Sequence, residues 1–213
     1  MEPTKSTLLP SGSLARKLSR YTTVTVGGLV GSVACFESGE AALIFTSSST
    51  VLDFSSPMTD INLDNSGADE LQIVRNHSGL LSAIGINNNA GLAGSSSGGF
   101  FYPTGLAASD LVSGGLTFGA SSLTAGTLAS ESFSAGDWAG GATKYMGAKF
   151  DIGLDTHYGW VHITWDAVVG EATIHGYAYE SVAGAPAQVP EPSSLALLGL
   201  GAMGLAARRR RQA

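Results

Sequence analysis

The sequence predicts an all-β protein, with a single antiparallel β-sandwich or jelly-roll-like domain between an N-terminal signal helix and a short C-terminal hydrophobic helix. Three observations support this fold class. Several segments alternate apolar and polar residues with the period of a strand. Glycine accounts for 29 of the 213 residues, and only 13% of residues are charged, against about 25% in an average soluble domain. No segment between residues 42 and 189 has the apolar spacing of an amphipathic helix.

Five segments of the central part have the composition and spacing of strands, namely residues 42–54, 70–76, 144–152, 158–166 and 171–180. In the fourth of them, Val161, Ile163 and Trp165 fall on one face of the strand. The opposite face carries Trp160, His162 and Thr164. Short turn-forming segments follow the third and the fourth, so the last three strands are predicted to form an antiparallel meander.

The stretch between residues 85 and 136 is rich in glycine, serine and asparagine. Such a composition is typical of a flexible linker between two domains. However, large apolar side chains such as Phe101, Leu116 and Phe118 recur in it and need a buried environment. We therefore expect long loops and short strands within one domain.

Residues 1–41 have the three parts of a secretory signal peptide. The leader carries the basic residues Lys5, Arg16, Lys17 and Arg20. An uncharged, partly apolar stretch covers residues 21–36, and the small residues Gly39 and Ala41 offer a cleavage site after Ala41. A buried N-terminal strand is the alternative interpretation. The pattern predicts export by Sec-type machinery and a mature domain over residues 42–188.

The single cysteine excludes a disulfide scaffold and a cysteine-based zinc site. A lipoprotein signal has an aliphatic residue three positions before its cysteine, whereas Ser32 occupies that position before Cys35. We therefore interpret Cys35 as an apolar member of the signal peptide rather than as a lipidation site.

Residues 189–213 form a tripartite tail. Pro190, Glu191 and Pro192 open it, residues 195–207 are apolar or glycine, and a cluster of four arginines follows, Arg208, Arg209, Arg210 and Arg211. Arginines beside an apolar helix stay on the cytoplasmic side of a membrane. Thirteen helical residues would span only about 20 Å of a hydrocarbon core of about 30 Å. The tail therefore predicts a transient anchor in the inner membrane.

This tail resembles the PEP-CTERM sorting signal of bacteria that make extracellular polysaccharide. The resemblance implies that a membrane-embedded cysteine transpeptidase of the exosortase type recognises Pro190, Glu191 and Pro192. It also implies removal of the tail and delivery to the cell envelope, the cell surface or the medium. Residues 145–150, 156–161 and 173–180 further resemble the last strands of PEP-CTERM passenger proteins, in which Tyr-Gly-Trp opens a strand and Tyr-Glu closes the final one.

The domain between the two ends is strongly acidic. Its three strong bases and thirteen acids over residues 42–189 give a formal net charge of −10. This charge suits solubility and calcium binding outside the cell, and it argues against nucleic acid as a partner.

One acidic segment resembles a calcium-binding loop. Asn62, Asp64 and Ser66 place oxygen atoms at alternate positions, Gly67 permits a tight turn, and Glu70 follows. An EF-hand would have acids in place of the Asn and Ser and a closing Glu further along. A metal-free turn held by Asx hydrogen bonds is the alternative.

The aromatic side chains of Trp160, Tyr177 and Tyr179, with Trp138, suggest a platform on which sugar rings of an extracellular polysaccharide would stack. Packing within the core is the alternative. His162 and His175 are predicted on adjacent strands, with His157 close by in sequence. These histidines could share a metal ion, or they could simply belong to a half-exposed face of the sheet.

No nucleophile elbow, zinc-protease helix or phosphate loop occurs in the sequence. Scattered acids such as Asp137, Asp166 and Glu171 offer only the unspecific material of a glycosidase pair. We expect a non-enzymatic cell-surface or extracellular-matrix protein without a cofactor other than calcium. A lectin-like carbohydrate-binding module is the first alternative, and a secreted hydrolase is the second.

Overall fold

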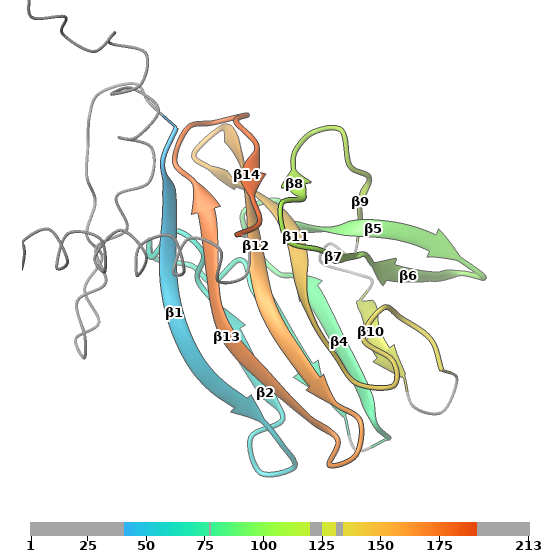
Figure 1. Ribbon diagram of the computed structural model, residues 1–213. Coiled ribbons are helices and arrows are strands. Elements are labelled where there is room, and N and C mark those ends of the chain that lie inside the picture. The colour runs from blue at the N-terminus through green and yellow to red at the C-terminus, as the bar shows by residue number, and fades with distance from the viewer. Residues whose placement is uncertain (1–40, 77, 120–124, 131–133, 191–213) are drawn as a thin grey trace, which may run out of the picture. The chain divides into compact units, whose positions relative to one another are not determined.

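The computed structural model describes residues 41–190, except residues 77, 120–124 and 131–133 (Figure 1). The described residues all belong to one compact unit. The predicted signal helix and the predicted C-terminal helix lie outside the described residues. Within the described part of the chain, no helix has the length and apolar character needed to cross a membrane.

All regular secondary structure of the described residues is β-strand, which confirms the predicted all-β class. The strands are β1 (Leu43–Leu52), β2 (Met58–Ile61), β3 (Leu71–Arg75), β4 (Leu80–Gly85), β5 (Gly91–Ser97), β6 (Phe100–Pro103), β7 (Gly105–Leu106), β8 (Leu111–Val112), β9 (Phe118–Gly119), β10 (Gly126–Ser130), β11 (Ala142–Ile152), β12 (Asp155–Asp166), β13 (Glu171–Glu180) and β14 (Ala187–Gln188).

Most strands belong to one large sheet of order β1-β13-β12-β11-β5-β6-β10-β4-β3-β2, with β7 beside β11 and β9 beside β5. Its pairs are antiparallel except for β6 with β10. The main core cluster joins Leu52 of β1, Ile73 of β3 and Ile163 of β12, which come from both ends of this order. The sheet therefore folds over its own apolar face, and Figure 1 shows β2 and β4 behind β12 and β13.

The predicted meander is confirmed. β11 pairs with β12 over its whole length, and β12 pairs with β13, both antiparallel. Val161, Ile163 and Trp165 are almost fully buried in the main core, as their alternation predicts. The turn between β11 and β12 contains only Gly153 and Leu154, and Gly153 has a φ of 68°, which glycine adopts without strain.

A second, smaller core covers the opposite face of the meander. It buries Trp160 of β12 and Ala178 of β13 against Val112 of β8 and against Ala187 and Val189 at the end of the described chain. β8 and β14 form a separate two-stranded sheet over this cluster. The meander is thus covered on both faces at this point.

The glycine- and serine-rich middle contributes short strands rather than an unpaired linker. β5, with the sequence GLAGSSS, pairs with β11, β6 and β9. Close approach of backbones explains part of the composition, because a Cβ atom at Gly94 would overlap the carbonyl oxygen of Tyr102 on β6.

Candidate functional site

The chain remains paired with the domain up to the first residue of the predicted sorting motif. β14 lies antiparallel to β8, and the pairing continues at Val189. The Val189 amide donates to the Asp110 carbonyl at 2.9 Å, and the Val189 carbonyl accepts from the Ser109 amide at 3.1 Å. The next residue, Pro190, is exposed. The predicted motif residues Glu191 and Pro192 and the four arginines from 208 to 211 lie outside the described residues.

Trp160 connects this C-terminal segment to the meander. Its indole Nε1 donates to the Gln188 carbonyl at 3.0 Å, while its ring is only 2% exposed. Ala187 and Val189 are fully buried in the same cluster. The domain therefore holds the chain immediately before Pro190 through side chains as well as through the backbone.

The predicted calcium loop forms a turn whose side-chain hydrogen bonds converge on Ser66. The Ser66 amide donates to Asp64 Oδ1 at 2.8 Å and to Asn62 Oδ1 at 3.1 Å, and its hydroxyl donates to Asp64 Oδ2 at 2.6 Å. The structure thus brings Asn62, Asp64 and Ser66 together. These contacts are those of an Asx turn, the metal-free alternative.

Glu70 binds the backbone of this segment from the interior rather than joining the side-chain oxygens of Asn62 and Asp64. It is fully buried, its Oε2 accepts from the Leu63 amide at 2.7 Å, and its Oε1 accepts from Asn88 Nδ2 at 2.7 Å. Burial raises the pKa of the Glu70 carboxyl, and the negative charge of Asp64 raises it further, against the opposing effect of the two hydrogen bonds. Both oxygens therefore serve the packing of two loops.

The calcium prediction makes one measurable claim. A cation bound only by the folded loop raises the thermal midpoint, because ligands of the native state stabilise it. Millimolar calcium is then expected to raise the midpoint of the wild-type protein but not that of Asp64→Ala, measured by scanning calorimetry with magnesium as the control cation. An unchanged wild-type midpoint would contradict calcium binding and favour the metal-free turn.

The aromatic residues predicted as a sugar platform do not lie on one surface. Trp160 belongs to the small core, whereas Tyr179 lies in the main core and Tyr177 packs against it, on the opposite face of the meander. Trp138 is fully buried and donates its Nε1 to the Ile163 carbonyl at 3.1 Å. These side chains therefore pack in the two cores, as in the alternative interpretation.

His162 and His175 lie side by side, as predicted, with ring centroids 4.8 Å apart. The His162 ring stacks on Tyr145 at 4.3 Å, and partial burial, with a further contribution from His175, lowers the pKa of His162. His157 lies five residues earlier on β12, opposite Phe150, and its Nδ1 is 2.9 Å from the Glu180 carbonyl oxygen. In the described part of the chain, no three His, Cys, Asp or Glu residues gather as a metal site would require.

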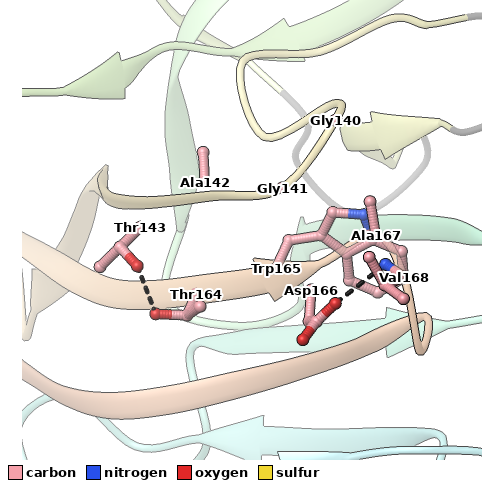
Figure 2. Close-up of a pocket in the computed structure, with 9 residues that line it drawn as sticks. All are labelled: Gly140, Gly141, Ala142, Thr143, Thr164, Trp165, Asp166, Ala167 and Val168. Carbon is pink, nitrogen blue, oxygen red and sulfur yellow. Dashed lines mark hydrogen bonds between the residues drawn. The ribbon is translucent and has the colours of Figure 1, made fainter.

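Figure 2 shows a shallow depression between the residues before β11 and the end of β12. The side chains of Thr143, Thr164 and Asp166 have hydrogen-bond partners, whereas the buried Nε1 of Trp165 has none among the described residues. The hydroxyls of Thr143 and Thr164 are 2.7 Å apart, and Thr164 Oγ1 lies 2.7 Å from His175 Nε2. Asp166 Oδ1 accepts from the Val168 amide at 2.8 Å. The hydroxyl pairs therefore link β11, β12 and β13, and Asp166 stabilises the β12–β13 turn.

Other acids of the domain also accept hydrogen bonds from within it. Asp137 accepts from the Gly105 amide at 2.7 Å, Asp151 accepts from Thr156 Oγ1 at 2.8 Å, and Glu180 accepts from the Val182 amide at 3.1 Å. Of the carboxylates named for a glycosidase pair, Asp137 and Asp166 thus accept hydrogen bonds within the domain.

The turn that receives Glu70 was not predicted from the sequence. Asn88 and Asn89 both adopt positive φ values, 52° and 51°. Asn88 binds Glu70, and Asn89 Nδ2 donates to Asp151 Oδ2 at 3.1 Å. The run of three asparagines at residues 87–89 was the available signal, because asparagine tolerates the left-handed region better than most residues.

Comparison with known proteins identifies the tail. Residues 188–211 match the family model of the PEP-CTERM protein-sorting motif, which confirms the resemblance seen in the sequence. The match includes Gln188 and Val189, which the structure places in the folded domain. No curated protein and no solved structure matches the chain significantly.

Proposed function

Because residues 188–211 carry a PEP-CTERM protein-sorting motif, which indicates extracellular sorting through an exosortase, we propose that this chain is a non-enzymatic component of the bacterial cell surface or extracellular matrix. Sec-type machinery exports it, and the tail anchors it transiently in the inner membrane. An exosortase-type transpeptidase then recognises Pro190, Glu191 and Pro192 and removes the tail.

The proposal rests mainly on the motif, and features of the domain support it. The positive charges of the chain are concentrated in its ends, so that removal of both leaves an acidic β domain. The carboxylates of Asp137 and Asp151 accept hydrogen bonds within the domain, and its tryptophans are buried, so these groups stabilise the fold. Proline at two of three motif positions keeps the backbone extended and prevents it from joining a helix.

Replacement of the motif tests this proposal. We expect the triple variant Pro190→Ala, Glu191→Ala, Pro192→Ala to accumulate at full length in the membrane fraction, because the extended recognition element is lost. The wild-type protein on the surface is expected to lack the residues that follow the motif, as measured by intact mass. The same chain in a strain without the transpeptidase is the control, and secreted wild-type protein with a full-length C-terminus would contradict the proposal.

A further inference from the structure

The sorting motif begins inside the folded domain. The matched span starts at Gln188, but Gln188 belongs to β14, and Val189 is fully buried and hydrogen-bonded through both its amide and its carbonyl. Pro190 follows directly, so no spacer separates the domain from the motif. The residues just upstream of the motif are therefore engaged in contacts within the protein.

We propose that β14 and Val189 form a latch on β8, and that this latch must open before the transpeptidase can process the chain. Trp160 is the positioning residue of the latch, because its indole holds the Gln188 carbonyl. This inference rests on the proposed function, since it concerns the same sorting step.

Enzymes that cleave peptide chains commonly bind them in extended form through backbone hydrogen bonds and side-chain pockets. In the latched state the backbone at residues 187–189 already pairs with residues 109–112, and the side chains of Ala187 and Val189 are buried. A membrane-embedded active site that engages the residues before Pro190 therefore competes with the domain for the same groups.

The latch can open without unfolding the main sheet. The latch contributes two side chains to the small core, Ala187 of β14 and the following Val189. This core is separate from the main cluster. Terminal elements with few buried contacts open at a lower free energy than the whole domain. When opening is fast relative to cleavage, the cleavage rate follows the open population.

A reversible crosslink tests the requirement for opening. Leu111 and Gln188 are opposite each other in the β8–β14 pair, and both are exposed. The only native cysteine, Cys35, lies in the predicted signal peptide. The full-length double variant Leu111→Cys, Gln188→Cys is oxidised, freed of oxidant and incubated with membranes that contain the transpeptidase.

We expect the oxidised form to remain uncleaved during the time in which the reduced form is fully processed. Both forms carry the same substitutions, so any effect of changing Gln188 within the motif cancels. Wild-type protein taken through the same oxidation shows that the enzyme stays active. Equal processing of the oxidised and reduced forms would overturn the latch, whereas a wild-type chain that is never processed would refute the proposed function instead.

A second variant opens the latch. Trp160→Phe removes the hydrogen bond to Gln188, and the loss of one such bond corresponds to about a five-fold rise in opening. We expect amide exchange at Val189 and the processing rate of the full chain to rise together by this factor. Trp138→Phe removes an equivalent bond to Ile163 elsewhere and is expected to leave both unchanged. Faster exchange in Trp160→Phe with unchanged processing would overturn the role of Trp160.

Discussion

Alanine at position 159 is expected to destabilise the domain by at least about 3 kcal/mol, the upper range for overpacked cores. A Cβ atom there would overlap the carbonyl oxygen of Ala178 and lie 3.1 Å from the Tyr179 Cβ. Both belong to β13, which pairs with β12 along this stretch. The clash can be relieved only by separation of two central strands, because the obstacle is backbone.

Urea unfolding followed by circular dichroism measures this effect. Gly115→Ala is the matched control, because its added Cβ would meet nothing nearer than Ser113 Oγ at 3.7 Å. The control is expected to change the free energy of unfolding by less than about 0.5 kcal/mol. A Gly159→Ala protein as stable as the control would show that β12 and β13 can shift apart without cost.

Removal of the Glu70 carboxylate is the second large change. Glu70→Ala leaves the buried amide of Leu63 without its acceptor and Asn88 without its side-chain partner. Each orphaned group costs about 1–3 kcal/mol, so we expect a total loss of about 3 kcal/mol in the free energy of unfolding, measured by urea titration. The exposed Asp60, whose carboxylate accepts from Gln72 Nε2, provides the control variant Asp60→Ala.

The pH dependence of stability reports the same carboxyl group. Because burial raises the pKa of Glu70 above 4.5, the native state retains its proton to higher pH than the unfolded chain. Its contribution to stability is therefore complete below pH 4.5 and is lost as pH rises through the raised pKa. Glu70→Gln is expected to remove this part of the slope. An identical slope in the wild type and the variant would show that Glu70 titrates normally.

The meander could be predicted because its sequence carries its own pattern. Val161, Ile163 and Trp165 alternate with more polar residues, and short turns at both ends leave only an antiparallel arrangement. The structure also explains the glycine of the Tyr-Gly-Trp sequence that resembles PEP-CTERM passenger proteins. Gly159 leaves room for Tyr179 of the neighbouring strand.

Other strands could not be predicted because their pairing depends on distant partners. β5 consists of glycine, serine, alanine and one leucine, all weak or neutral strand formers, and β11, β6 and β9 hold it in place. The burial of Trp160 depends likewise on β8 and β14, which are distant in sequence. Residue type alone does not distinguish an indole on an open surface from one covered by a two-residue strand.

The distribution of the three tryptophans gives the protein an internal optical probe. Trp138 and Trp165 lie in the main core, and Trp160 alone lies in the smaller one. In a Trp138→Phe, Trp165→Phe background, fluorescence would come from the indole that contacts Gln188. A red shift of its emission would then mark the arrival of water beneath the last strand, in real time and without an added dye.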